Sequence, residues 1–372
     1  MELSEIRKEI DKLDREIQPL FERRMELCRE VAAYKKAHNM PVFQSDREQA
    51  ILDRVEKNAS GDLGLASRTL FANIMSISSQ LQQKMLVNEE EAPEIPLPAM
   101  EKAIRVGCQG TVGANSETAA QNFFPGREIQ FYPTFDQLFE AVESGELEYG
   151  VLPIYNSTSG TVTQTVDLMG KYQFFVTAMN RVEVSHCLAG LPGSSIEDIS
   201  LVYSHPQALS QCSDFLDSHN LPRRDYSNTA TAAQMVTEAG DTAIAAICSE
   251  ECARRNHLEI LASRISNVVP NYTQFICITK DMQVDSNASV ISVMLTLSNE
   301  PGSLSRILNK FFLYGLDMTK LESRPIQNGS FDVVFHIDFK GNLRDRSIAA
   351  FLNDLCKSCQ NFKLLGNAVV ME

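Results

Sequence analysis

An arginine interrupts an apolar seam that runs along the start of the chain. Apolar side chains recur there in steps of three and four residues, the heptad pattern of a helix that packs along one stripe. The seam consists of Leu3, Ile6, Ile10, Leu13, Ile17, Leu20, Leu27, Val31 and Tyr34. Arg24 fills its one gap, and a buried guanidinium is costly unless it pairs with an acid, reaches water or meets an anion. A helix of about 35 residues is roughly 50 Å long, so the pattern predicts an interlaced dimer.

Composition narrows the function classes. The chain has 372 residues, enough for two or three domains, and its net charge of −14 argues against nucleic acid as a main partner. It shows neither an apolar run that could cross a membrane nor a signal peptide. Nine scattered cysteines favour reduced thiols in a cytoplasm, and the single Cys356–Cys359 spacing is weak support for a metal site. We expect a cytoplasmic protein without a metal or a membrane partner.

Changes in composition and in the spacing of apolar residues divide the chain into four segments. Residues 1–86 are helical throughout, and residues 87–103 are an acidic, Pro-rich extended linker. Residues 104–280 alternate short apolar strands with helices, which predicts an α/β domain with a largely parallel sheet. Residues 289–372 follow the order βαββαβ of a ferredoxin-like α+β domain, with Asn328-Gly329 as the turn of a hairpin.

The helical segment carries polar residues that suit a small dianion with a hydroxyl group. Cations, one carboxylate, one hydroxyl and one amide occur on or beside helix faces that could converge. They are Arg7, Arg24, Lys35, Arg47, Glu48, Ser78 and Gln82. A coiled coil that served only for dimerisation would use leucine at core-facing positions such as Arg24 and Gln82, which favours a binding site over that alternative.

These residues lie in segments that resemble the all-helical chorismate mutases over residues 1–86. The matching segments are Ile6–Asp11, Glu22–Arg24, Lys35, Asp46–Glu48 and Ser78–Gln82. The resemblance implies that all seven polar residues are catalytic. It further implies that Arg7 and Arg24 hold the substrate carboxylates, with one of them from the partner chain. Lys35 and Gln82 would bond the ether oxygen, and Glu48 the ring hydroxyl.

The implied reaction fits these residue types. Chorismate becomes prephenate by a unimolecular rearrangement that needs no nucleophile, proton transfer or cofactor. It needs one folded conformer of the substrate and positive charge beside the breaking C–O bond. Arginine forks suit carboxylates, and a lysine suits a single oxygen.

The middle segment is similar throughout to the prephenate dehydratases. Four stretches carry the resemblance, namely Gly150–Gly160, Tyr203–Leu209, Asn228–Ala233 and Asn271–Phe275. It implies two α/β lobes with the site in the cleft between them, and a reaction that expels CO₂ and the ring hydroxyl to give phenylpyruvate. The departing oxygen needs a hydrogen-bond donor, a role that the resemblance gives to Thr273. It assigns substrate contacts to Asn156, Ser157, Thr158, Ser204 and Gln207. For His205 we favour a loop cap over an acid.

Two positions depart from that family's usual pattern. The family usually has Arg where this chain has Gln274, and Glu where it has Tyr155. Loss of an Arg beside a dianionic substrate would remove a charge-assisted contact worth about 1.5–3 kcal/mol. Arg181 is a candidate to replace that charge.

The C-terminal segment resembles the ACT regulatory domain. Its two phenylalanine-binding stretches match residues 300–304 and 321–325. The resemblance assigns phenylalanine binding to Gly302, Ser303, Leu304, Glu322, Ser323, Arg324 and Pro325. The N–H groups of a helix that begins after Gly302 could meet a carboxylate, and such domains bind amino acids at a dimer interface.

The sequence therefore predicts a multidomain enzyme of L-phenylalanine biosynthesis. It would rearrange chorismate, dehydrate prephenate and respond to phenylalanine by feedback inhibition, as a homodimer or higher oligomer without a cofactor. An alternative keeps the mutase active and makes the middle segment a weakened, dehydratase-like ligand sensor, on the strength of Gln274 and Tyr155.

Overall fold

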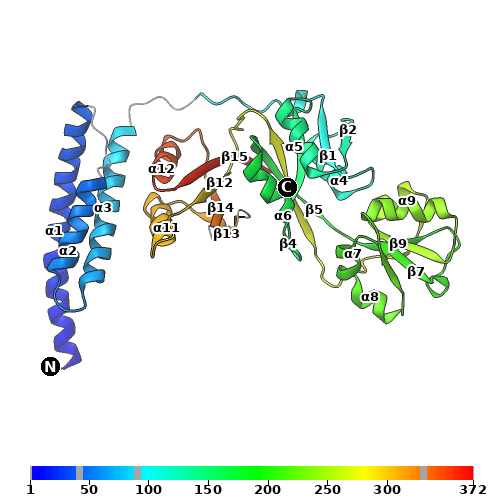
Figure 1. Ribbon diagram of the computed structural model, residues 1–372, viewed down its shortest axis with the longest axis horizontal. Helices are drawn as coiled ribbons and strands as arrows, with labels where there is room; N and C mark the ends of the chain where they lie inside the picture. Colours follow the sequence, from blue (N-terminus) through cyan, green and yellow to red (C-terminus); the bar gives the residue numbers. More distant parts are fainter. Residues whose placement is uncertain (1, 39–44, 88–93, 327–332, 372) are drawn as a thin grey trace. The chain divides into compact units, whose positions relative to one another are not determined.

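The computed structural model describes residues 2–38, 45–87, 94–326 and 333–371 (Figure 1). These residues form two compact units. The first unit comprises residues 1–94 and 295–362, and the second comprises residues 95–294 and 363–372.

Three helices open the first unit, as the sequence predicts. They are α1 (Leu3–Ala37), α2 (Ser45–Asn58) and α3 (Gly64–Val87), and both α1 and α2 pack against α3. A capping box between Glu2 and Glu5 satisfies backbone groups at the start of α1.

The apolar seam of α1 is exposed in the single chain. α1 buries only Met25, Ala32 and Lys35. By contrast, Leu20 on the seam is 71% exposed, and the other seam residues from Leu3 to Tyr34 are exposed as well. A row of exposed large apolar side chains along 35 residues is typical of a surface that another chain covers.

The C-terminal elements follow the predicted βαββαβ order. They are β12 (Val290–Thr296), α11 (Ser303–Tyr314), β13 (Met318–Pro325), β14 (Val333–Lys340), α12 (Arg346–Cys356) and β15 (Asn361–Met371). The strand order is β13-β14-β12-β15, and β13 pairs antiparallel with β14. Rings of Phe311, Phe339 and Phe351 join α11 and α12 to the sheet, with centroids 4.7–5.4 Å apart. The expected turn at Asn328-Gly329 lies outside the described residues.

The second unit has two α/β lobes. The first lobe contains β1 (Val106–Gln109), α4 (Asn115–Phe123), β2 (Ile129–Tyr132), α5 (Phe135–Ser144), β3 (Tyr149–Asn156), β4 (Gly160–Thr161), α6 (Thr163–Lys171), β5 (Phe175–Glu183) and β11 (Tyr272–Thr279). The second lobe contains β6 (Cys187–Gly190), β7 (Leu201–Ser204), α7 (Pro206–Gln211), α8 (Ser213–Ser218), β8 (Arg223–Asp225), α9 (Thr229–Ala239), β9 (Ile244–Cys248), α10 (Glu250–Arg255) and β10 (Glu259–Ala262). Two single 3₁₀ turns, Met100–Lys102 and Ile196–Asp198, also belong to this unit, as do most of β12 and β15, and β15 pairs in parallel with β5.

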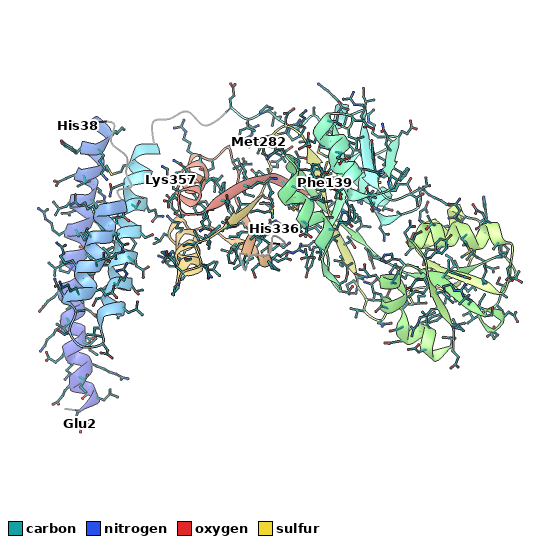
Figure 2. The ribbon with its side chains drawn as sticks, viewed as in Figure 1. Glu2, His38, Phe139, Met282, His336 and Lys357 are labelled. Atoms are coloured by element: carbon teal, nitrogen blue, oxygen red, sulfur yellow. The ribbon has the colours of Figure 1, made fainter. Side chains whose placement is uncertain are left out.

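Helices cover both faces of the first lobe's sheet. On one face, Asn180 of β5 donates to the Ala119 carbonyl of α4 at 3.3 Å. On the other face, Gly150 of β3 faces the α5 side chains of Leu138 and Val142. Phe139 of α5 anchors that layer through ring contacts with Tyr172 and Phe174, which lie between α6 and β5 (Figure 2).

The sheets are mixed rather than largely parallel. β1 pairs in parallel with β2 and β3, but β11 pairs antiparallel with β3 and β5. The physical reason is the route of the chain, which leaves the first lobe after β5, builds the second lobe and returns as β11 between β3 and β5. A repeat of strands and helices along the sequence does not reveal such a return.

The second half of the predicted linker is part of the second unit. Pro96 accepts a hydrogen bond from Val284 N at 2.9 Å, and Ala99 N donates to the Tyr149 hydroxyl at 3.2 Å. Ala103 is only 2% exposed. An extended, Pro-rich segment can therefore pack along a domain, because its free carbonyl groups accept hydrogen bonds and its apolar residues find partners.

Candidate functional site

A cavity of about 140 Å³ is lined by side chains of all three N-terminal helices. Six of the seven polar residues predicted for this region line it, namely Arg24, Lys35, Arg47, Glu48, Ser78 and Gln82. Arg7 does not, because it lies 17 residues before Arg24, or about 25 Å along the helix axis. One chain thus supplies all of the predicted set except one arginine.

Hydrogen bonds hold the cavity wall in place. Arg24 Nη1 donates to the Ser78 hydroxyl at 2.5 Å, and that hydroxyl donates to the Ile74 carbonyl at 2.8 Å. Gln82 is 8% exposed, and its buried Oε1 has no hydrogen-bond partner among the described residues. A buried amide oxygen without a partner is costly in an empty site and indicates a place for a polar ligand.

Burial shifts the pKa values of two cavity residues. Desolvation lowers the pKa of the Lys35 ammonium, an effect that the Glu48 carboxylate opposes. Desolvation also raises the pKa of the Glu48 carboxyl, and the nearby positive charges of Lys310 and Lys35 oppose this increase. The cavity therefore combines a cation that titrates below its usual range with an acid that titrates above it.

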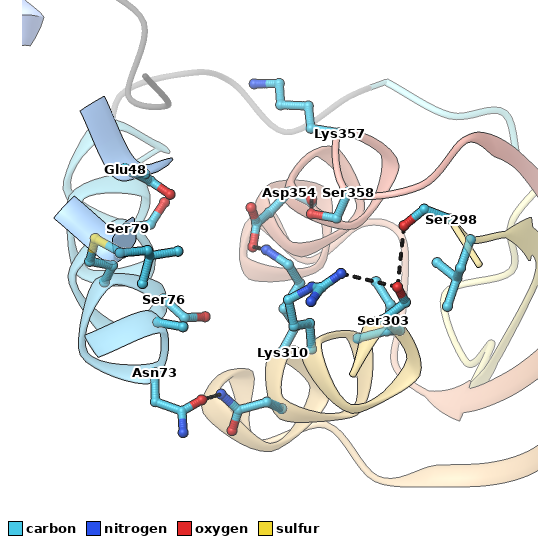
Figure 3. A pocket seen from close by; sticks show the side chains of 17 residues that line it. Glu48, Asn73, Ser76, Ser79, Ser298, Ser303, Lys310, Asp354, Lys357 and Ser358 are labelled. Atoms are coloured by element: carbon cyan, nitrogen blue, oxygen red, sulfur yellow. Dashed lines mark hydrogen bonds and ion pairs between the residues drawn. The ribbon is translucent and has the colours of Figure 1, made fainter. Parts of the chain in front are cut away.

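A second cavity, about 310 Å³ in volume, lies beside Glu48 within the same unit (Figure 3). Glu48 and residues of α3 line one side, and Ser303, Lys310 and Asp354 of α11 and α12 line the other. Lys310 Nζ lies 2.6 Å from the Asp354 carboxylate. Glu48, which is predicted to bind the substrate hydroxyl, and Ser303, which is predicted to bind the regulatory ligand, thus border one cavity.

In the second unit, Asn156 organises the loop after β3. Its Oδ1 accepts hydrogen bonds from the backbone N–H groups of Thr158 and Ser159 at 3.1 and 3.0 Å. Its Nδ2 donates to Asn271 Oδ1 at 2.8 Å and to Thr273 Oγ1 at 3.0 Å. This amide is fully engaged within the protein, so it positions its neighbours, which differs from the substrate contact predicted for it.

The same loop meets the second lobe. Gln207 Nε2 donates to Ser159 Oγ at 2.6 Å, and Gln211 Nε2 donates to Thr158 Oγ1 at 2.9 Å. Gln211 Oε1 lies 3.0 Å from His186 Nε2, and burial lowers the pKa of that imidazole. Ser157 instead bonds Tyr272, with its backbone N–H and its hydroxyl.

Gln211, His186 and Asn271 are members of this network that the sequence did not single out. Asn271 lies inside the matching stretch Asn271–Phe275, and this was the one feature of the sequence that could have identified it as a member of the network. Gln211 lies beyond the end of its stretch, and nothing in the spacing of residues links it to the loop after β3.

Ser204 and His205 have structural roles. Ser204 is fully buried, and its hydroxyl donates to the Ile247 carbonyl at 2.6 Å, so in this arrangement it does not reach a substrate. This differs from the expected substrate contact. His205 caps α7, because its Nδ1 accepts the Gln207 N–H at 3.2 Å. The predicted capping role of His205 is confirmed.

Thr273 keeps a hydrogen to donate. Its Oγ1 accepts from Asn156 Nδ2 at 3.0 Å, and no acceptor for its own hydroxyl hydrogen lies among the described residues. Its register partners are Asn156 on β3 and Val182 on β5. Directly opposed residues point to the same face, which here is the face that α4 covers.

The two departures from the expected pattern face each other on the opposite side of the sheet. Gln274 pairs directly with Tyr155 on β3 and with Arg181 on β5. Because successive strand residues point to opposite faces, all three side chains lie away from Thr273. Gln274 Nε2 contacts Met179 Sδ at 3.2 Å. Gln274 and Arg181 therefore lie on the sheet face opposite Thr273, the residue predicted to contact the substrate.

The two predicted regulatory stretches lie apart in one chain. Gly302 has a φ of +83° and caps α11 directly before Ser303, whose hydroxyl accepts from Arg306 at 3.0 Å. The other stretch ends β13, where Glu322 pairs in register with His336. The strand β14 lies between β13 and β12. Among the described strands β13 is an edge, so a second chain could bring the two stretches together.

The described residues contain no group of three or more His, Cys, Asp and Glu side chains that could hold a metal ion. In that same part of the chain, every helix is too short or too polar to span a bilayer.

Comparisons with known proteins identify two family domains in this chain. The family model for chorismate mutase type II matches residues 6–83, and the model for prephenate dehydratase matches residues 106–283. The bifunctional chorismate mutase/prephenate dehydratase of Aquifex aeolicus (strain VF5) is 29% identical, with 98% of this chain and 97% of the relative covered. The arogenate dehydratase/prephenate dehydratase 1, chloroplastic, of Arabidopsis thaliana is 32% identical over 83% of this chain and 82% of the relative.

A solved structure agrees as well. Prephenate dehydratase from Arthrobacter aurescens in complex with L-Phe aligns with a TM-score of 0.65 and 26% identity, over 71% of this chain and 89% of that one. The N-terminal helices form a chorismate mutase domain, and the two lobes form a dehydratase domain of the prephenate dehydratase type. The chain therefore belongs to the prephenate dehydratase family, in the bifunctional form that also carries a type II chorismate mutase domain.

Proposed function

We propose that chorismate binds in the 140 Å³ cavity and that prephenate binds beside Thr273, between the two lobes. The observation that carries the first assignment is the convergence of six predicted polar residues on one cavity. The second rests on a hydroxyl whose hydrogen is free to donate. Incubation with chorismate, with prephenate and phenylpyruvate followed separately, tests both.

In the mutase cavity, each residue has a role that suits its chemistry. Arg24, oriented by Ser78, binds a carboxylate. Lys35 and the Gln82 amide bond the ether oxygen, where negative charge develops in the transition state. Glu48 bonds the ring hydroxyl, and Arg47 adds positive charge at the cavity wall.

Arg7 reaches the cavity of a partner chain in this proposal. The exposed seam of α1 supports a homodimer, because two such helices laid antiparallel would cover it and carry each Arg7 toward the other chain's Arg24. The mutase site is incomplete without the second copy.

In the dehydratase, Thr273 donates to the ring hydroxyl as it leaves while the carboxylate departs as CO₂. Asn156 orients Thr273, and Ser157, Thr158 and Gln207 surround the substrate with polar groups. The alternative, a dehydratase-like sensor, is disfavoured by the position of Tyr155 and Gln274 on the opposite sheet face. A wild-type protein with mutase turnover and no prephenate turnover would restore it.

The C-terminal segment, residues 289–372, acts as an ACT regulatory domain in this proposal, after a mutase domain at 1–86, a linker at 87–103 and a dehydratase domain at 104–280. Its effector is phenylalanine, the ligand of the similar Arthrobacter aurescens enzyme. Gly302, Ser303 and Leu304 of one chain and Glu322, Ser323, Arg324 and Pro325 of another form the site. Nine free cysteines support a reducing, cytoplasmic location.

Phenylalanine is expected to bind and to inhibit the dehydratase far more than the mutase. A coupling of about 1–3 kcal/mol, or roughly 5–150-fold, is typical between sites. Calorimetry with phenylalanine and paired assays measure this on wild type, Glu322→Ala and, as a control, Asp317→Ala, which alters an exposed acid just before β13. Glu322→Ala should weaken binding and Asp317→Ala should not. Absence of binding at millimolar phenylalanine would remove the regulatory proposal.

Mutase activity is expected to fall at alkaline pH. The fall should begin at a lower pH than it would if the activity depended on a lysine with an ordinary pKa. Lys35 must be protonated to donate, and desolvation lowers its pKa, so activity is lost as pH rises through that lowered value. Burial raises the pKa of Glu48, but the carboxylate that accepts from the ring hydroxyl is formed, not lost, as pH rises, so Glu48 does not cause the alkaline loss. In pH profiles, Lys35→Arg should remove the alkaline break and Lys36→Arg should retain it. A break that persists in Lys35→Arg contradicts the role of Lys35.

A further inference from the structure

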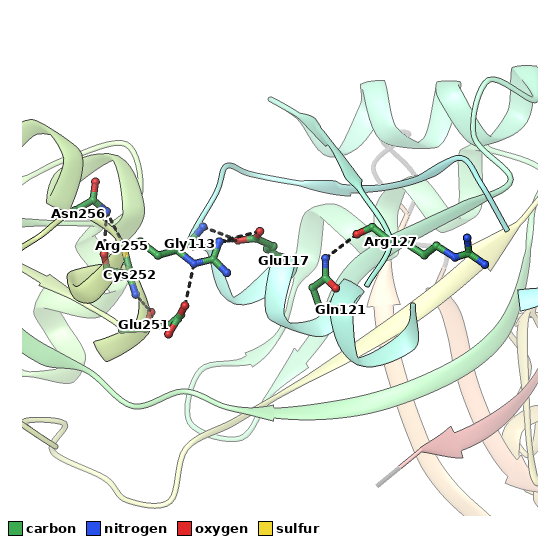
Figure 4. Close-up of polar contacts among 9 residues, drawn as sticks. Gly113, Glu117, Gln121, Arg127, Glu251, Cys252, Arg255 and Asn256 are labelled. Carbon is green, nitrogen blue, oxygen red and sulfur yellow. Dashed lines mark hydrogen bonds and ion pairs between the residues drawn. The ribbon is translucent and has the colours of Figure 1, made fainter. Parts of the chain in front are cut away.

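The Glu117 carboxylate bridges the two lobes of the dehydratase at the start of α4 (Figure 4). Arg255 of α10, in the second lobe, donates from Nη1 to both oxygens of Glu117 at 2.9 and 3.0 Å. Glu117 Oε2 also accepts the N–H of Gly113 at 2.7 Å. The Glu117 side chain is 13% exposed and that of Arg255 is 41% exposed, so solvent screens this ion pair from the arginine side only.

The loop before α4 is built for a close approach to α10. Gly113 has a φ of +85°, and a Cβ added there would lie 3.2 Å from Cys252 Sγ of α10. A side chain at this position would be strained and would press on the helix. Both the conformation and the space at Gly113 therefore favour direct contact between the loop and the second lobe.

The contact lies where open α/β sheets bind ligands. The loop follows the carboxyl end of β1, and α10 follows the carboxyl end of β9. α4 covers the sheet face on which Thr273 lies, through contacts such as Asn180 Nδ2 to the Ala119 carbonyl. A displacement of α10 relative to α4 would therefore change the space in front of Thr273.

The lobes meet at another point as well. Gln207 and Gln211 of the second lobe bond the loop after β3, as described above. Those contacts are between neutral groups, whereas the contact at α4 is an ion pair that also holds a backbone N–H. Within the described residues 94–326, the chain crosses between the lobes only after β5 and before β11, so side-chain contacts set how far the lobes close.

We propose that Glu117 and Arg255 form a latch that holds the lobes in the closed arrangement and orders the Gly110–Ala114 loop for prephenate binding. Both are positioning residues, because they act through α4 and the loop. The latch stabilises the closed form, which brings Gln207 to the substrate that Thr273 meets. This inference rests on the proposed placement of prephenate beside Thr273.

The test compares Arg255→Gln and Glu117→Gln with Glu251→Gln. Glu251 is the matched control, since it pairs with Arg255 Nε at 2.9 Å within α10 and does not bridge the lobes. Loss of the latch should raise KM for prephenate about tenfold, as expected for a charge-assisted hydrogen bond, with a smaller change in kcat. Glu251→Gln should stay within about twofold of wild type. Arg255→Lys, which keeps the charge, should recover part of the loss.

Two further measurements separate a latch from general destabilisation. The Gly113 amide should exchange its hydrogen faster in Glu117→Gln and Arg255→Gln, and the double variant should be no worse than either single one, because the two residues act as a unit. Mutase turnover serves as an internal control for folding. An unchanged KM in Arg255→Gln, or an equal effect in Glu251→Gln, overturns the latch. Absence of prephenate turnover in wild type would instead count against the proposed dehydratase site.

Discussion

Arg24→Ala is expected to reduce mutase turnover by about 10²–10³-fold, the usual effect of removing one preorganised donor from a charged transition state. The substitution removes the guanidinium from the cavity but leaves Ser78 bonded to the Ile74 carbonyl, so the helices should remain packed. Chorismate consumption measures the effect, and the dehydratase assay with added prephenate should be unchanged.

The neighbouring arginine provides a matched control. Arg23 is exposed and pairs with Glu26 at 3.0 Å on the outer side of α1, so Arg23→Ala removes the same charge without touching the cavity. It should retain near-normal turnover. Equal losses in both variants would point to the stability of α1 rather than to the cavity, and near-normal turnover in Arg24→Ala would contradict the assigned site.

Complementation tests the contribution of the partner chain to the same site. Arg7→Ala and Arg24→Ala should each be inactive alone. In a mixed dimer, one of the two sites combines Arg24 of the Arg7→Ala chain with Arg7 of the Arg24→Ala chain. That site is intact, and the other site lacks both arginines. Random pairing of equal amounts should therefore recover about one quarter of wild-type activity, as expected for a two-fold symmetric dimer with shared sites. No recovery after subunit exchange would show that Arg7 acts within its own chain or not at all.

The helical domain was largely predictable because its signals are local. A period of three to four residues fixes α1, and polar residues at core-facing positions mark a cavity without knowledge of the tertiary structure. The pattern did not predict whether the seam of α1 packs against the chain's own helices or lies exposed. The structure shows the seam exposed and Met25 and Lys35 turned toward the chain's own helices.

The dehydratase was less predictable because its geometry depends on strand pairing across long stretches of chain. Tyr155 and Gln274 lie 119 residues apart in the sequence, yet they are direct partners on β3 and β11. No periodicity within either strand specifies that register, so the sequence alone suggested two independent losses near a substrate. With the register known, the two departures are direct partners: Tyr155 stands where the expected pattern has Glu, and Gln274 stands where it has Arg.

Burial decided the other differences. Ser204 belongs to a matching stretch, but its hydroxyl serves the Ile247 carbonyl in the core of the second lobe. Gln211 lies outside the stretch and yet contacts both His186 and Thr158. A sequence motif identifies the loop that enters a site, whereas the direction of each side chain depends on the packing beneath that loop.

Thr273→Val is expected to reduce phenylpyruvate formation by about 10²-fold or more, the effect of losing a positioned proton donor, with mutase turnover unchanged. Valine replaces the hydroxyl by a methyl group of similar size. Asn156 Nδ2 keeps its bonds to Asn271 Oδ1 and to the Tyr272 carbonyl, so the loop after β3 should stay ordered. Gln274→Ala is the matched control, one residue along β11 and on the opposite face, and it should leave turnover within about threefold of wild type, as expected for a substitution away from the site. Assays with purified prephenate measure both variants. A large loss in Gln274→Ala with retained activity in Thr273→Val would place the substrate on the other face of the sheet and contradict the proposed site.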